Sequence, residues 1–168
     1  MNLAEFCSRL EEQLTAVPAD TDRLEVMART ISRAFNANPE EVAIFLFDDK
    51  REIVSFLWPL RLRNAGTLPL SAHASLVTRT IREKRAFVDN SFSTTPHASI
   101  FEQFRLGPET APQPIQKIMS APLSHGGEVR GVIQVSRKGA SGESAGADFS
   151  ANQLVALGKI AEVAARFI

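Results

Sequence analysis

Cysteine is almost absent from this chain, which has one, Cys7, among 168 residues. A single cysteine excludes an internal disulfide and a zinc site closed by several thiolates. We therefore expect a reducing, cytoplasmic environment. Net charge is absent as well, because 19 lysine and arginine residues balance 19 aspartate and glutamate residues. Without an excess of positive charge, nucleic acid and anionic membrane surfaces are poor candidates as partners.

Long apolar runs are also missing. No segment reaches the roughly 18 uninterrupted apolar residues of a membrane-spanning helix. The N-terminus, MNLAEFCSRLEEQ, is acidic and amphipathic, whereas a secretory signal is basic and then apolar. Hydrophobic residues nevertheless make up 44% of the chain, which is enough for a core. We expect one soluble domain spanning residues 1–168.

Apolar residues spaced three and four apart predict amphipathic helices at both ends of the chain. The first helix is expected over residues 1–17, and a second follows the acidic cap at residues 20–22. The last helix is expected to begin at Ser150, which forms a capping box with Gln153, and to run to residue 168.

Between these helices the pattern changes to that of strands and hairpins. Runs of apolar and aromatic residues closed by polar turns predict one hairpin in the first half of the chain and another in the second. Since hairpins join neighbouring antiparallel strands, the fold class is α+β, with helices packed on a mostly antiparallel sheet of five to six strands. The expected strands are 41–49, 52–60, 86–90, 116–123 and 128–138.

The middle of the chain is expected to cover one face of this sheet. Ser71 is a candidate cap for a helix that runs to about residue 84. Residues 91–114 are rich in serine, threonine and proline, with one aromatic cluster at 100–104, which indicates a long loop holding a short helix. Long ordered loops in compact domains tend to be functional, so this loop is a candidate lid.

Four motifs, taken in order, resemble those of the GAF domain, a small-molecule-sensing module of signalling proteins. The resemblance covers nearly the whole chain and implies a three-layer arrangement, with the terminal helices on one sheet face and a ligand pocket under a helix and loop on the other. The motifs are VAIFLFDD (42–49), LPL (68–70) with SLVTRTIREKRAFVDN (75–90), APLSHGGEVRGVIQVSRK (121–138) and DFSANQLVAL (148–157).

The resemblance implies four ligand-binding residues, each with a simpler alternative. Gln134 occupies a position where relatives have a polar residue facing the pocket, although it would equally bond a neighbouring loop. Trp58 matches a position whose ring stacks on the ligand, although a core or interface tryptophan is the commoner role. Leu76 and Val77 match positions whose backbone groups touch ligands, although packing alone explains their side chains.

Departures from the family patterns argue against the known cofactors. Members that bind cyclic nucleotides carry an Asn-Lys…Phe…Asp-Glu signature, and Arg137, Gln153 and Leu154 replace three of its residues here. A bilin needs a suitably placed cysteine, and Cys7 lacks the surrounding sequence. We therefore expect no cofactor, and neither cyclic GMP nor bilin as the ligand.

The histidines give no sign of a haem or metal site. Imidazole is a common ligand, but His73, His97 and His125 are scattered and show no ligand spacing. Free methionine-sulfoxide reductases of the family need cysteines that line the pocket, which this chain lacks apart from Cys7 on the first helix. No catalytic constellation is evident, so we expect no enzyme activity.

Three functions stay open at this level. The first is a non-enzymatic sensory or regulatory domain that binds an unidentified small cytoplasmic molecule and signals through its terminal helices to an output domain. The second is a structural dimerisation module whose pocket is filled by its own bulky residues, since the chain has 11 phenylalanines. The third, a methionine-sulfoxide reductase, rests on the enzymatic relatives alone.

Assembly is predicted from the terminal helices. Their apolar stripes are close to the seven-residue period of paired helices, and one sheet face is too small to cover both helices completely. We therefore expect a two-fold homodimer in which the N- and C-terminal helices form a bundle, with Phe6, Leu10 and Leu14 buried across the interface.

Overall fold

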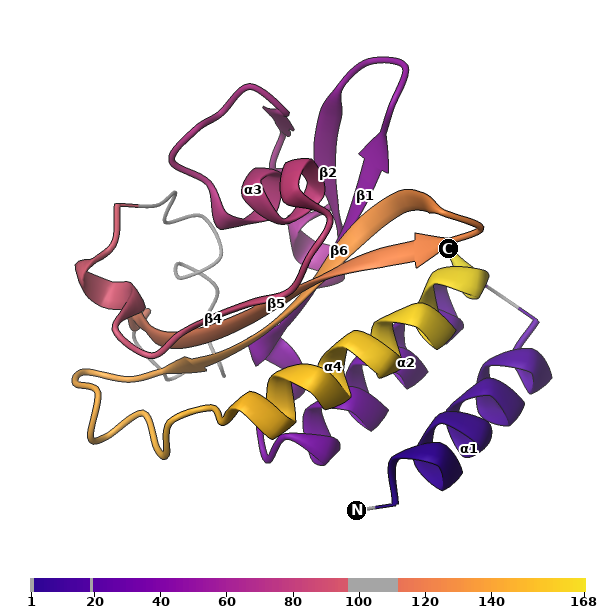
Figure 1. Cartoon of the computed structure of the whole chain (residues 1–168), viewed down its shortest axis with the longest axis horizontal. Coiled ribbons are helices and arrows are strands. Elements are labelled where there is room, and N and C mark those ends of the chain that lie inside the picture. The colour runs from indigo at the N-terminus through magenta and orange to yellow at the C-terminus, as the bar shows by residue number, and fades with distance from the viewer. Residues whose placement is uncertain (1, 19, 97–111) are drawn as a thin grey trace.

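The computed structural model describes residues 2–18, 20–96 and 112–168, except for the side chains of residues 20 and 21. Over these residues, a six-stranded antiparallel sheet has the order β3-β2-β1-β6-β5-β4 (Figure 1). The predicted α+β fold class is therefore confirmed. The strands are β1 (Val42–Asp48), β2 (Ile53–Trp58), β3 (Thr67–Pro69), β4 (Phe87–Asp89), β5 (Ile115–His125) and β6 (Glu128–Lys138), and the helices are α1 (Leu3–Ala16), α2 (Asp20–Ala34), α3 (Leu76–Glu83) and α4 (Ala151–Ala164).

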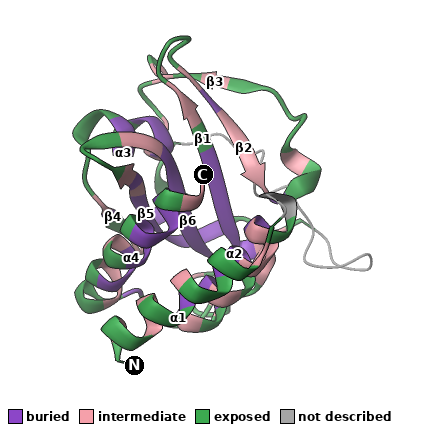
Figure 2. Cartoon of the chain, turned by 90° about the vertical axis from the view of Figure 1, so that its right-hand side faces the viewer, coloured by how far each residue is buried: buried purple, intermediate pink, exposed green. Residues whose placement is uncertain are grey.

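The centre of the sheet is the long β5-β6 hairpin with β1 beside it. Its turn uses Gly126 and Gly127 at φ 62° and 80°, a backbone region that side chains other than glycine rarely adopt. Figure 2 shows the buried residues concentrated along β1, β5 and β6, where both faces of the sheet are covered. Successive residues of a strand point to opposite faces, so these strands supply two separate cores.

Helices α2 and α4 cover one face of the sheet, and α1 packs on both of them at the outside of the molecule (Figure 1). Leu10 and Leu14 of α1 are 0% exposed within the single chain. The prediction that these two residues are buried across a dimer interface is therefore wrong. Helix α1 is stacked on α2 and α4 and does not lie beside them on the sheet, so it buries its apolar stripe against these two helices. Phe6 is partly buried against the same core.

The opposite face carries α3, which begins later than the sequence predicted. Its N-cap is Ser75 rather than Ser71. The chain first adds the edge strand β3 to β2, with Leu68 opposite Val54, and then turns back over the sheet. Leu70 N donates to Glu52 O at 2.8 Å, and Ser71 lies in the turn that follows. The expected helix at 100–104 and the candidate lid fall largely outside the described residues.

The start of α4 is fixed as the sequence predicted. Ser150 Oγ accepts from Gln153 N at 3.1 Å, and Ser150 N donates to Gln153 Oε1 at 2.8 Å, which completes the capping box. The side-chain amide of Asn90 holds the backbone of the preceding residue, Phe149: Phe149 N donates to Asn90 Oδ1 at 2.9 Å, and Asn90 Nδ2 donates to Phe149 O at 3.0 Å. This clamp ties the start of α4 to the segment that follows β4.

Candidate functional site

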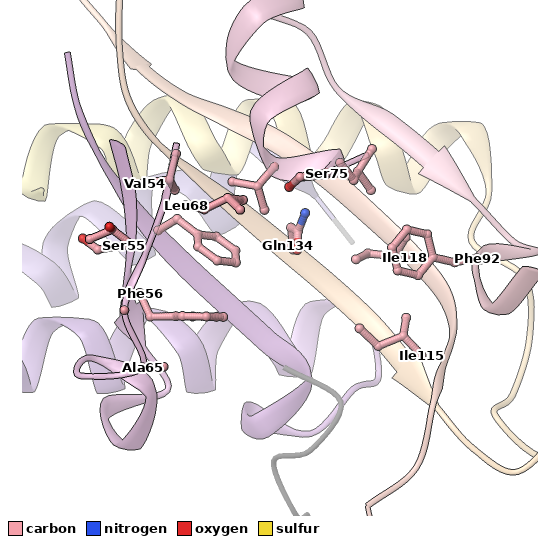
Figure 3. A pocket seen from close by; sticks show the side chains of 15 residues that line it. Val54, Ser55, Phe56, Ala65, Leu68, Ser75, Phe92, Ile115, Ile118 and Gln134 are labelled. Atoms are coloured by element: carbon pink, nitrogen blue, oxygen red, sulfur yellow. The ribbon is translucent and has the colours of Figure 1, made fainter. Parts of the chain in front are cut away.

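A cavity of about 120 Å³ lies between the sheet and the start of α3. Three aromatic rings, from Phe45, Phe56 and Phe92, contribute to its lining, and the rings of Phe45 and Phe56 are 4.5 Å apart. Figure 3 shows the side chains of Val54, Leu68 and Phe56 on one side and those of Ile118 and Phe92 on the other. The cavity is comparable to the roughly 150 Å³ apolar cavity that holds benzene in an engineered protein.

Gln134 stands near the middle of this lining and is 5% exposed (Figure 3). The other polar side chains around it are those of Ser55, Thr67 and Ser75. Among the described lining residues, none carries an ionisable side chain. The site is therefore apolar with one buried amide, a composition suited to a small uncharged molecule.

The amide of Gln134 belongs to a chain of hydrogen bonds that leads away from the cavity. Its Nε2 donates to Ser120 Oγ at 3.2 Å, and Ser120 Oγ lies 2.7 Å from Thr80 Oγ1. Thr80 Oγ1 donates to the carbonyl oxygen of Leu76, also at 2.7 Å. Ser120 and Thr80 are 0% exposed. The hydrogen bonds thus connect β6, β5 and the first turn of α3 beneath the helix.

Leu76 and Val77, which the sequence singled out, also line the cavity. They are the first two residues of α3, and Ser75, their N-cap, makes no side-chain capping hydrogen bond. The first N–H groups of a helix lack partners within the helix. The start of α3 therefore brings backbone donors as well as apolar side chains to the cavity.

Trp58 does not line this cavity, and the expectation that its ring faces the pocket is wrong. Its ring packs with the core on the sheet face that α2 and α4 cover, called the helix face below. Its Nε1 donates to Pro39 O at 3.0 Å. A β-bulge explains the difference. Trp58 lies opposite Ile44 and Phe56 opposite Phe45, so Leu57 is an extra residue. The bulge breaks the alternation of side chains and turns Trp58 away from the face that holds Phe56.

Sequence reasoning missed several contributors to this site. Phe45 was recoverable from the strand pattern, because Ala43 and Phe45 alternate with the helix-side residues Val42 and Ile44. Ser120 and Thr80 carried no local signal, since their bond joins residues 40 positions apart. Such pairings follow from the fold and not from neighbouring residues.

Arg137, at the position of the family's signature asparagine, has a structural role. Its guanidinium donates to the carbonyl oxygens of Phe35 and Asn36, both at 3.1 Å, and lies 4.4 Å from the centre of the Phe149 ring. It therefore caps the carboxyl end of α2 and joins it to the start of α4. Burial of this group lowers the pKa of Arg137, and nearby Glu41 partly offsets the effect.

The remaining candidates that the structure describes do not line the cavity. Cys7 is partly buried in α1, where desolvation raises the pKa of its thiol and Glu162 raises it further. His73 borders a surface groove beside β4 that shares Ser75, Leu76 and Phe92 with the cavity lining. His125 lies at the β5-β6 turn, and His97 falls outside the described residues. In the described part of the chain, no group of three His, Cys, Asp or Glu side chains is arranged to hold a metal ion. None of its helices has the length and apolar character needed to cross a bilayer.

Two antiparallel hairpins in one sheet, with stacked helices on one face and a cavity under α3 on the other, define an open-sheet α+β fold. The sequence model described as "GAF domain" matches residues 20–168. The chain belongs to the GAF domain family. GAF domains are usually regulatory or sensory modules of signalling proteins.

Solved structures with this fold include both regulatory domains and enzymes. The GAF domain of an Acinetobacter phosphoenolpyruvate-protein phosphotransferase is 18% identical, with a TM-score of 0.69 over 99% of this chain and 93% of that chain. The free methionine-R-sulfoxide reductase of Neisseria meningitidis, solved with its substrate, is 15% identical, with a TM-score of 0.66 over 98% of this chain and 87% of that chain. At these identities the likeness shows the fold alone. No protein with a curated description matches the chain.

Proposed function

We propose that this chain is a non-enzymatic sensory or regulatory domain that binds a small, uncharged and largely apolar molecule between the sheet and α3. The observation that carries the proposal is the cavity of about 120 Å³ with one buried amide, from Gln134, in an apolar lining. A charged ligand would lose its hydration there without gaining an opposite charge from any of the described lining residues, which costs several kcal/mol. Nucleotides and free amino acids therefore fit the site poorly.

A signalling role is supported by the way the two faces share strands. On β6, Val132 and Gln134 face the cavity side, whereas Ile133 and Val135 belong to the core under α2 and α4. A ligand that shifts β6 or α3 would therefore also shift the packing of the terminal helices, through which an output domain would be controlled. A homodimer through these helices stays a prediction, and light scattering at micromolar concentration tests it.

The reductase function is disfavoured by the position of the thiol. Cys7, the one cysteine of the sequence, lies in α1 and packs against the helix-side core. Reduction of a sulfoxide by a thiol needs the sulfur at the substrate, and α1 is separated from the cavity by the sheet. A Cys7→Ala variant should therefore bind ligands as the parent chain does.

A thermal-shift screen tests the proposed function. The screen compares small neutral aromatics and heteroaromatics with nucleotides and amino acids, because a ligand that binds only the folded state raises its melting temperature. We expect shifts from the neutral set alone. The matched control is Val77→Phe, which fills the cavity and should abolish them. An absence of shifts across the neutral set would instead favour the structural dimerisation module, whose pocket is closed by its own phenylalanines.

A further inference from the structure

The hydrogen-bond chain beneath α3 has a fixed direction. The carbonyl oxygen of Leu76 can only accept, so Thr80 must donate to it. A hydroxyl has one hydrogen, so in its contact with Ser120 the oxygen of Thr80 accepts. Ser120 Oγ therefore donates its hydrogen to Thr80 Oγ1. Ser120 therefore has only its lone pairs left for Gln134, which must present its NH2 group.

This direction determines which end of the Gln134 amide faces the cavity. The oxygen and nitrogen of an amide have nearly the same shape, so packing alone would not distinguish them. With Nε2 held by Ser120, Oε1 is the free end, and no hydrogen bond to it is found among the described residues. Within the same residues, Arg137 Nε is the one fully enclosed side-chain polar atom without a partner, so Gln134 Oε1 is open to the cavity that this side chain lines.

We propose that Ser120 and Thr80 act as specificity-determining residues by holding Gln134 with its carbonyl oxygen toward the ligand. Neither residue lines the cavity itself. The pocket then selects small neutral molecules that carry an N–H or O–H donor on an otherwise apolar body. This inference rests on the proposed function, since it names the class of ligand taken by the same site.

Three probes of nearly equal size separate the alternatives, namely phenol, pyridine and benzene. All three are neutral at pH 7; phenol brings a donor, pyridine only an acceptor, and benzene neither. An acceptor placed against Gln134 Oε1 leaves both groups unpaired, which weakens binding by about tenfold or more relative to a paired donor. We therefore expect phenol to bind the parent chain about tenfold more tightly than pyridine in an NMR titration.

Two variants test the role of the hydrogen-bond chain formed by Thr80 and Ser120, called the relay below. Thr80→Val keeps the shape of the side chain but removes the acceptor for Ser120, which then donates to Gln134 Oε1. The amide turns over, its NH2 group faces the cavity, and the preference reverses toward pyridine. Ser120→Ala leaves the amide without an anchor, and phenol and pyridine should then bind within about threefold of each other.

The matched control is Ser136→Ala. Ser136 lies on β6 and, like Ser120 and Thr80, is 0% exposed. It donates to Glu41 O at 3.1 Å and does not line the cavity. It should keep the preference for phenol. In the ligand-free protein, the side-chain amide resonances of Gln134 should move in Thr80→Val and stay in place in Ser136→Ala.

The outcomes distinguish the inference from the proposed function. If phenol and pyridine bind the parent chain equally, or if folded Thr80→Val keeps the preference for phenol, the specificity role of the relay is overturned while ligand binding stands. If none of the three probes binds the parent chain, the proposed ligand-binding function is overturned and the ligand class with it. Unmoved Gln134 amide resonances in Thr80→Val would overturn the relay without reference to any ligand.

Discussion

The two faces of the sheet differ in how completely they are filled. Under α2 and α4, side chains such as Leu14, Ile31 and Leu157 are 0% exposed and form one continuous core. Under α3 the core is smaller, and it surrounds a cavity that contains the polar group of Gln134. Filled cores resist changes of volume, whereas a cavity tolerates an added group. We infer that the helix face supplies most of the stability and the α3 face supplies the binding site.

The largest expected effect comes from a charge placed in the helix-face core. Leu10→Glu would bury an unpaired carboxylate at a position that is 0% exposed, and should cost about 3–5 kcal/mol of the free energy of unfolding. Chemical denaturation measures the loss. Leu10→Met, the control of similar volume, should cost less than about 1.5 kcal/mol. A variant that stays folded but changes from dimer to monomer would instead place Leu10 at an interface.

Arg137 gives a second test on the helix face, through polar groups rather than apolar packing. Arg137→Met keeps an apolar stem but leaves the carbonyl oxygens of Phe35 and Asn36 without their donors. We expect a loss of about 2–3 kcal/mol in urea denaturation, with phenol binding unchanged. The control is Arg51→Met, whose side chain is 78% exposed and should have little effect. Equal stability of the two variants would contradict the capping role.

A pair of small-to-large substitutions compares the two faces directly. Ala161→Leu adds three carbons to the helix-face core, where Ala161 is 0% exposed, and should cost about 1–3 kcal/mol. Val77→Phe adds four carbons beside the cavity and should cost less than Ala161→Leu while removing ligand binding, because the cavity leaves room for the larger side chain. Thermal unfolding measures both. Equal losses would mean that the α3 face is as tightly packed as the helix face.

The smallest effect concerns the outer surface of α3. Glu83 accepts hydrogen bonds from Arg79 and Arg85, which lower the pKa of its carboxyl below the ordinary value of 4.5. Because the folded pKa is lowered, the stabilisation is present above the unfolded pKa and is lost as the pH falls through the folded one. Glu83→Gln should therefore lower the melting temperature slightly at pH 7 and leave it unchanged at strongly acidic pH. A difference that persists in acid would contradict this account.

Much of this fold could be predicted from local sequence patterns. The capping box of Ser150 and Gln153, the turn at Gly126 and the apolar stripe of α1 are each determined by residues close together in the sequence, and each is present in the structure. The partner of that stripe was not predictable in the same way. Leu10 and Leu14 would be apolar whether a second copy or α2 and α4 covered them.

The candidate site was predicted in part. The family resemblance placed Leu76, Val77 and Gln134 at the cavity. It also placed Trp58 there, but the bulge at Leu57 turns Trp58 to the other face. The sequence could not predict which end of the Gln134 side-chain amide faces the cavity. This orientation depends on Ser120, which lies 14 residues away and is brought beside Gln134 by the register of β5 against β6.

The central claim is that the α3 face binds a small neutral ligand and the helix face does not. A phenol titration followed by the methyl resonances of both faces tests it most directly. We predict saturable shifts that are largest for Val54, Val77 and Ile118 around the cavity. Leu10 and Leu157 should show only smaller shifts, with the same midpoint, that report the repacking of the terminal helices. Val77→Phe should show no saturable shifts. Shifts that appear first among the helix-face methyls, or that survive Val77→Phe, would contradict the account.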